Sequence, residues 1–102
     1  MTEIPAIWAT SGLATAPDVL ARMRDFSSAL QRGDAQAALE ASRDVCLATP
    51  NSAEAHYAFG QAWMAAGKPA RAEQAFAIAT KLRPDFADAW VNFGLARYAQ
   101  GS

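Results

Sequence analysis

The chain has 102 residues, 52% of them hydrophobic, and a net charge of −1, which suits one globular domain and argues against disorder. It has no dense stripe of Lys or Arg, so we expect no nucleic acid partner. No apolar run reaches the roughly 20 residues needed to span a bilayer, so we expect no membrane partner either.

Residues 1–17 form an N-terminal segment whose apolar side chains lack a sustained period, and Gly12 and Pro17 separate it from the first predicted helix. We expect this segment to cap the first helices, to lie in a groove, or to be an idle tail. The stretch over residues 1–13 contains Glu3 and no Lys or Arg, which argues against a signal peptide. Because Cys46 is the single cysteine, no disulfide framework forms within the chain, and a cytoplasmic location is the simpler expectation.

Residue types recur along the chain at a fixed period of 34 residues. The recurring positions are Gly33, Gly67 and Gly101; Gly60 and Gly94; Pro50 and Pro84; Ala38 and Ala72. Such a period is typical of repeat architectures, in which each unit buries its apolar face against its neighbours. We therefore predict a repeat domain over residues 18–102, with units at 18–52 and 53–86 and a half-unit at 87–102.

The second unit begins with a predicted helix over residues 53–66, where large apolar residues fall at helical spacing. Asn51 is the expected N-cap, because its side chain accepts a hydrogen bond from the first turn. Gly67 suits the left-handed position that ends a helix.

A second helix is predicted over residues 69–82, with Pro69 in its first turn. Pro84 stops this helix, because the residue before a proline is pushed out of the helical region. Asp85 then repeats the start signal for a helix that runs to about residue 100.

The large and small residues of these helices form a recognisable signature. The second unit carries Phe59, Gly60, Trp63, Ala72, Phe76, Ala79 and Pro84, and the half-unit carries Trp90, Phe93 and Gly94. In this pattern the chain resembles the tetratricopeptide repeat (TPR) family, with departures at His56 and Arg97 and in a degraded first unit. The resemblance implies an all-α solenoid of about two and a half helix-turn-helix repeats in a right-handed superhelical stack.

Two glycines, Gly60 and Gly94, fall in the middle of predicted helices, where glycine costs about 1 kcal/mol relative to alanine. We expect a neighbouring helix to approach each glycine too closely for a side chain. The aromatic residues Trp63, Phe76, Trp90 and Phe93 are then expected to pack between helices rather than to form a stacking platform for ligands.

The resemblance implies that the first helix of each pair lines a concave face that binds extended peptides or partner helices. If Trp90 and Phe93 pack inward, the stripe turned away from them is the predicted binding site. We call it the inner stripe: Glu54, Tyr57, Gln61 and Met64 in the second unit, and Asp88, Val91, Asn92, Leu95 and Tyr98 in the half-unit. In the first unit it continues through Leu20, Met23, Ser27 and Leu30.

The chemistry of this stripe favours a basic or mostly apolar segment, because Glu54 and Asp88 stand at its mouth. Family members that clamp a C-terminal carboxylate use Lys, Arg and Asn on this face. The matching positions here are Met23, Ser27, Ala58, Asp88 and Asn92, so a carboxylate clamp is not expected. The alternative is that part of the stripe is ordinary surface or is covered by the N-terminal segment.

Catalysis is not expected, and neither is a metal or another cofactor. His56 is the only histidine, and no Cys or carboxylate cluster has ligand spacing. We expect Cys46 and His56 to be packing residues, and nothing in the sequence indicates that they are adjacent.

Trp90 and Phe93 belong to the face that would pack on a following helix, yet the sequence ends at Ser102. We consider a piece of a longer protein, a homodimer through the open C-terminal end, or a natural cap. The predicted function is a non-catalytic scaffold that binds a protein or peptide. The alternative is an N-terminal regulatory or oligomerising appendage of a larger enzyme of the transferase or oxygenase type.

Overall fold

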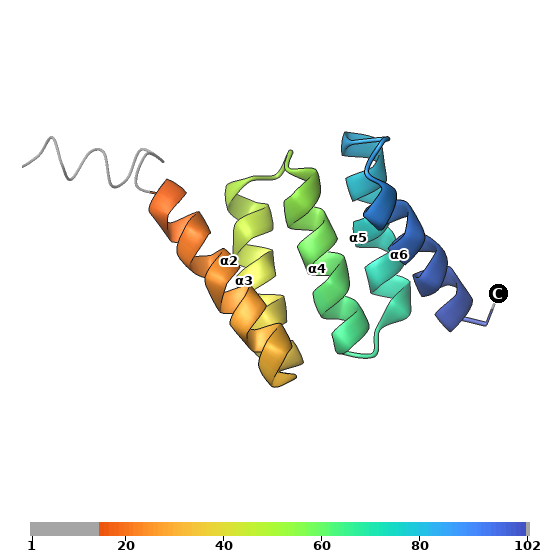
Figure 1. The fold of residues 1–102 in the computed structure, drawn as a ribbon, viewed down its shortest axis with the longest axis horizontal. Helices are drawn as coiled ribbons and strands as arrows, with labels where there is room; N and C mark the ends of the chain where they lie inside the picture. Colours follow the sequence, from red (N-terminus) through yellow and green to blue (C-terminus); the bar gives the residue numbers. More distant parts are fainter. Residues whose placement is uncertain (1–14, 102) are drawn as a thin grey trace, which may run out of the picture.

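The computed structural model describes residues 15–101, with side chains from Asp18 onward, and this part of the chain consists of helices and short connections (Figure 1). The helices are α2 (Thr15–Arg32), α3 (Ala35–Ala48), α4 (Ala53–Ala65), α5 (Pro69–Leu82) and α6 (Ala87–Ala99). The expected role of residues 1–14 as a cap or tail lies outside the described residues.

Consecutive helices pack side by side in a row, so that α2 with α3 and α4 with α5 form two hairpins and α6 adds half of a third. The period seen in the sequence is the period of the fold, because α3 and α5 begin 34 residues apart, as do α4 and α6. The prediction of an all-α helical repeat is confirmed.

The helix ends follow local chemistry. Gly33 and Gly67 have φ angles of 75° and 73°, in the left-handed region that favours glycine; Gly33 directly follows α2, and Gly67 follows Ala66, the C-cap of α4. Asp34 caps α3, since its carboxylate accepts a hydrogen bond from the amide of Ala37 at 3.1 Å. The expected cap of α4, Asn51, is wrong by one position: Ser52 directly precedes the helix, and its Oγ accepts from the amide of Ala55 at 3.2 Å.

The first described helix also begins earlier than expected. α2 starts at Thr15, so Pro17 lies in its first turn instead of separating the helix from the N-terminal segment. Proline is tolerated there because the first amides of a helix have no acceptor within it.

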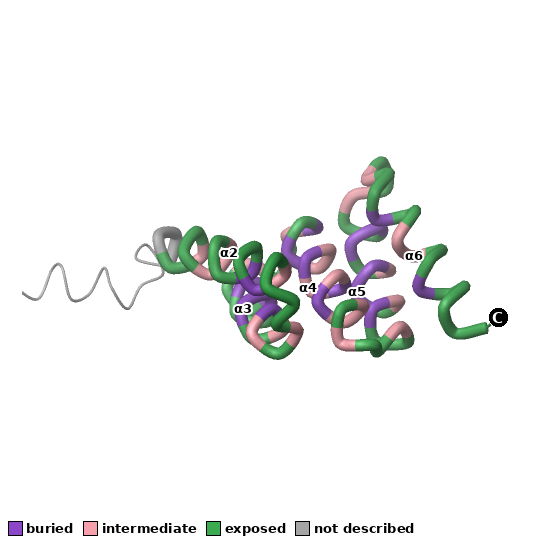
Figure 2. The backbone as a smooth tube through the Cα atoms, turned by 60° about the horizontal axis from the view of Figure 1, so that its bottom comes forward, coloured by how far each residue is buried: buried purple, intermediate pink, exposed green. Residues whose placement is uncertain are grey.

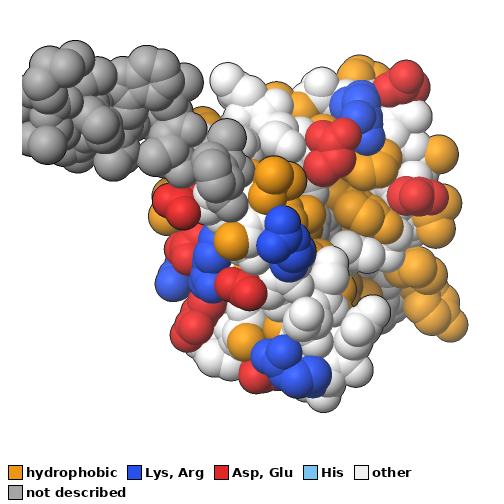
Figure 3. Space-filling model, turned by 60° about the vertical axis from the view of Figure 1, so that its left-hand side comes forward, with side chains coloured by type: hydrophobic (Ala, Val, Ile, Leu, Met, Phe, Trp, Pro, Cys, Tyr) orange, Lys and Arg blue, Asp and Glu red, His pale blue; other side chains and the backbone are white. Residues whose placement is uncertain are grey.

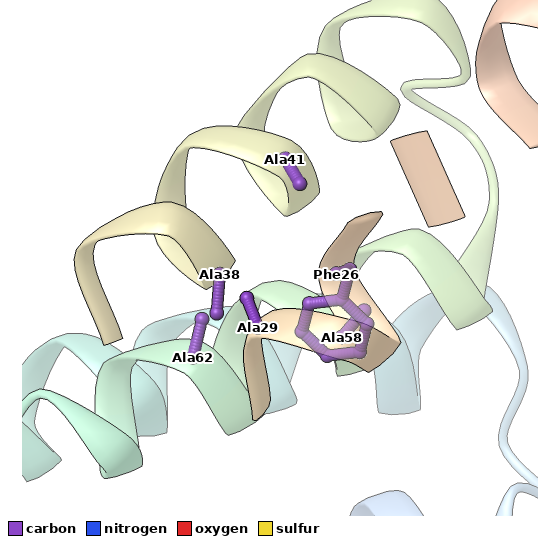
Figure 4. Packing of buried hydrophobic residues seen from close by; sticks show 6 residues of the cluster. All are labelled: Phe26, Ala29, Ala38, Ala41, Ala58 and Ala62. Atoms are coloured by element: carbon purple, nitrogen blue, oxygen red, sulfur yellow. The ribbon is translucent and has the colours of Figure 1, made fainter. Parts of the chain in front are cut away.

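The core between the helices is built from small residues around a few aromatic rings. Phe26 of α2 lies among alanines of α2, α3 and α4 (Figure 4), namely Ala29, Ala38, Ala41, Ala58 and Ala62. Phe76 of α5 is fully buried with Ala72 and Ala96. The alanines let neighbouring helices approach closely, and the rings fill the remaining space.

The two mid-helix glycines, Gly60 and Gly94, differ in how closely a neighbouring helix approaches them. A Cβ atom on Gly60 would lie 2.5 Å from the ring of Phe76, so the predicted close approach is confirmed there. At Gly94 the same prediction is wrong, because a Cβ atom would meet nothing within 4 Å. The reason is that Phe76 comes from the second helix of its unit, and the half-unit that contains Gly94 has only its first helix within residues 15–101.

The exposed side of α6 follows from the same fact. Figure 2 shows mostly exposed backbone along α6, whereas buried positions concentrate on α3, α4 and α5. The prediction that Trp90 packs inward is wrong: its side chain is 49% exposed, and its indole donates a hydrogen bond to the carbonyl of Pro84. Phe93 is half-buried and meets Trp90 edge to face.

Candidate functional site

The first helices of the units lie close together. α2 contacts α4, and α4 is joined to α6 by a hydrogen bond of 3.2 Å from the side-chain amide of Asn92 to the hydroxyl of Tyr57. The second helices, α3 and α5, have fewer contacts with each other than α2 has with α4, since each of them packs mainly on α4. The side of α2, α4 and α6 is therefore the tighter, inner side of the row, where the inner stripe was predicted.

The residues of the inner stripe differ in exposure. Tyr57, Gln61, Met64 and Asn92 are half-buried between helices, while Glu54, Asp88, Val91, Leu95 and Tyr98 are exposed. Along α6, the exposed fractions of Val91, Leu95 and Tyr98 are 61%, 51% and 80%. The stripe thus has a packed floor on α4 and an open apolar wall on α6.

Tyr57 has a structural role within that floor. Its ring lies 5.7 Å from the ring of Phe76 and 4.9 Å from that of Phe86, centroid to centroid. Burial, and secondly the nearby charge of Asp88, raise the pKa of the Tyr57 hydroxyl, although the hydrogen bond from Asn92 lowers it. Removing this ring would loosen the packing of α4 on α5 as well as any ligand contact.

Arg83 changes the electrostatics of the predicted acidic mouth. The guanidinium of Arg83 pairs with the carboxylate of Glu54 and lies over the ring of Phe86 at 4.2 Å. A hydrogen bond from its own amide, followed by the bond from Arg83, holds the pKa of Glu54 below its ordinary value. Asp88 is therefore the carboxylate of the inner stripe that makes no ion pair within the described residues.

Cys46 and His56 are adjacent, contrary to expectation, because the turn between α3 and α4 brings them together. The Sγ atom lies 3.9 Å from Nδ1, and the thiol donates to the carbonyl of Ala55. The other ring nitrogen, Nε2, donates to the carbonyl of Pro50 at 2.9 Å. Burial raises the pKa of the Cys46 thiol to about 11, so the thiol stays protonated at neutral pH and the pair is a packing contact rather than a nucleophile with its base.

Within residues 18–101, no three His, Cys, Asp or Glu side chains gather as metal ligands would. No helix in the described part of the chain is long and apolar enough to cross a membrane. On the face drawn in Figure 3, acidic and basic side chains are interspersed.

The structure also has a hollow surface that we did not predict from the sequence. It lies between α3 and α5, over the part of α4 that carries Phe59 and Trp63, whose rings are 5.5 Å apart. Both residues belong to the repeat signature and were assigned to packing, but each is only half-buried. The basic residues were a signal in the sequence, since Arg43 lies on α3, Arg71 lies on α5 and Lys68 is the N-cap of α5.

Helical hairpins that recur at 34 residues and pack in a row define a helical-repeat protein. A family model described as tetratricopeptide repeat matches residues 29–91, from the end of α2 to the start of α6. The chain belongs to the tetratricopeptide repeat family, whose repeats generally mediate protein–protein interactions. No curated protein matches the chain.

Proposed function

We propose that the chain is a non-catalytic scaffold, located in the cytoplasm, that binds a protein or peptide through the inner stripe. The observation that carries the proposal is the apolar wall on α6, where Val91, Leu95 and Tyr98 remain exposed, while Met64 of α4 packs toward Ala96 of α6. Contiguous exposed apolar side chains with polar neighbours are typical of interaction sites. Tyrosine and methionine suit such a site because they combine contact area with adaptability.

The charges of the stripe indicate the chemistry of the segment. Arg83 already neutralises Glu54, so Asp88 is the carboxylate available for a basic group of the partner. We infer a mostly apolar segment with one Lys or Arg near the start of α6. The positions of the family's carboxylate clamp do not favour a C-terminal carboxylate, since Ala58 is buried and Asp88 would repel it.

The test is a selection from a random peptide library displayed on phage. We expect enriched peptides to be apolar with a basic residue, and to lose at least about tenfold in affinity for the double variant Leu95→Ser with Tyr98→Ser, since losing two apolar contacts costs more than about 1.4 kcal/mol. Leu47→Ser, on α3, is the matched control because Leu47 is also exposed, at 74%. Equal losses in both variants would refute the site. Tyr57 is left intact because its ring holds α4 to α5.

A second proposal concerns the end of the row. Trp90 and the open notch at Gly94 form a face on α6 that no described helix covers, and the half-buried Phe93 lies at the edge of this face, where it also packs toward Phe76. We propose that a second copy of the chain covers this face, giving a homodimer. The same face and stripe would serve equally in a regulatory or oligomerising appendage of a larger enzyme.

A further inference from the structure

We infer that the chain has a second binding face, a groove between α3 and α5 that takes an acidic peptide segment carrying an apolar side chain. We call it the outer groove. It is separate from the inner stripe and does not depend on the function proposed for that stripe.

The groove consists of two hollows that share the same floor. One, of about 240 Å³, extends from Phe59 and Trp63 along α5 to Ile78. The other, of about 380 Å³, extends from the same two rings along α3 to Leu39. The hollows exist because α3 and α5 each pack mainly on α4, so the edge of α4 is left between them. The result is an aromatic floor with aliphatic walls, large enough for at least one apolar side chain.

The rim of the groove is basic. Arg43 on α3 and Arg71 on α5 line its two walls, and Lys68 lies at its end. None of these three cations makes an ion pair within the described residues, whereas Arg22, Arg32, Arg83 and Arg97 each do. The carboxylate in the lining is that of Glu40, which accepts a hydrogen bond from Gln36.

Three cations against one carboxylate stand out in a chain with a net charge of −1, so charge complementarity favours an anionic occupant. The guanidinium of Arg71 lies 5.2 Å from the centre of the Trp63 ring, a placement that leaves its N–H groups available to a carboxylate. The N-terminus of α5 adds to the positive electrostatic potential of the groove, because its N-cap is Lys68 and no side chain caps it.

A peptide fits these features better than a nucleic acid does. The floor is apolar, and the excess positive charge is confined to one short groove rather than spread as a stripe. Along the roughly 20 Å of a helix of this length, an extended segment of about six residues spans the groove. One leucine or phenylalanine of that segment would contact Phe59 and Trp63, while flanking Asp or Glu residues would pair with Arg43 and Arg71.

The experiment titrates a synthetic peptide, with glutamates flanking a pair of leucines, into the ¹⁵N-labelled chain and follows the amide and indole signals by NMR. We expect the indole signal of Trp63 and the amide signals of Arg71 and Ile78 to shift, while the indole of Trp90 does not. A matched peptide with glutamine in place of each glutamate should bind at least about tenfold more weakly.

Charge reversal provides the matched variants. The double variant Arg43→Glu with Arg71→Glu should bind the acidic peptide with an affinity at least about tenfold lower. The double variant Arg24→Glu with Lys81→Glu changes the net charge equally, and its affinity for the peptide should fall less than about twofold. All four side chains are exposed, so the fold is retained. Any of three outcomes would overturn the inference. The two double variants could weaken binding equally, the glutamine peptide could bind as tightly as the acidic peptide, or the signal shifts could be confined to the inner stripe.

Discussion

At the scale of single residues, Gly60 and Gly94 occupy equivalent positions with opposite surroundings. In Gly60→Ala, the new methyl group would meet the ring of Phe76 at 2.5 Å, and Phe76 is fully buried. The strain of overpacking, about 1–3 kcal/mol, is offset in part by the roughly 1 kcal/mol gained in helix propensity, so we expect a net loss of up to about 2 kcal/mol in the free energy of unfolding.

In Gly94→Ala, the methyl group would enter open space, so only the propensity gain remains. We expect this variant to be more stable by about 0.5–1 kcal/mol. Urea unfolding followed by circular dichroism measures both variants against the parent chain. If Gly60→Ala were stabilised as much as Gly94→Ala, the close approach of Phe76 to α4 would be wrong.

The same scale shows where prediction from the sequence stops. Spacing along one helix correctly placed Phe76 in the core and Cys46 among buried residues. It did not reveal the contacts of Cys46 with His56 or of Arg83 with Glu54, because those contacts depend on how turns fold one helix back on another. Which of the inner stripe residues bind a ligand stays a prediction.

At the scale of helices, ends marked by proline or glycine were the most predictable. α5 begins at Pro69 and ends at Leu82 as predicted, since Pro69 suits a first turn and Pro84 prevents continuation. The start of α2 was missed, because proline in a first turn and proline in a linker give the same sequence signal.

Helix packing also predicts a gradient of local stability. α4 and α5 have neighbours on both sides, whereas α6 packs on α5 and, through Tyr57 and Asn92, on α4, with its other side open. In a linear repeat the terminal element has the fewest interfaces, so it opens most easily. We expect hydrogen exchange, followed by mass spectrometry, to be faster by at least about tenfold in α6 than in α4 and α5.

A control is available within the same element. Asn92→Ala removes the hydrogen bond to Tyr57 and should speed exchange further in α6 without changing α3. If α6 of the parent chain were as protected from exchange as α4, the predicted gradient of local stability would be contradicted. The exception is protection of α6 that disappears on dilution, because a dimer that covers α6 would behave in this way.

At the scale of the whole molecule, the two sides of the row differ in charge and chemistry. The inner stripe has an apolar wall with Asp88, and the outer groove has an aromatic floor with Arg43, Lys68 and Arg71. A scaffold built this way would hold two segments of opposite charge at once.

Self-association would use the end of the row and compete with one of these surfaces. Trp90 and Phe93 flank the open notch at Gly94, and Leu95 follows it on the same helix. A second chain docked on α6 would cover part of the inner stripe, while the outer groove between α3 and α5 would remain open. Peptides for the inner stripe should therefore shift dimer to monomer, and acidic peptides should not.

Light scattering over a range of protein concentrations measures this equilibrium. We expect the mass of two chains at high concentration, falling toward that of one chain on dilution, because a face of this size gives a reversible contact. Trp90→Gln should favour the monomer, whereas Leu47→Gln, at an exposed position of α3, should leave the mass unchanged. A single-chain mass at every concentration would rule out the homodimer, yet the inner stripe would stand, since its apolar wall needs only a partner segment and not a second copy.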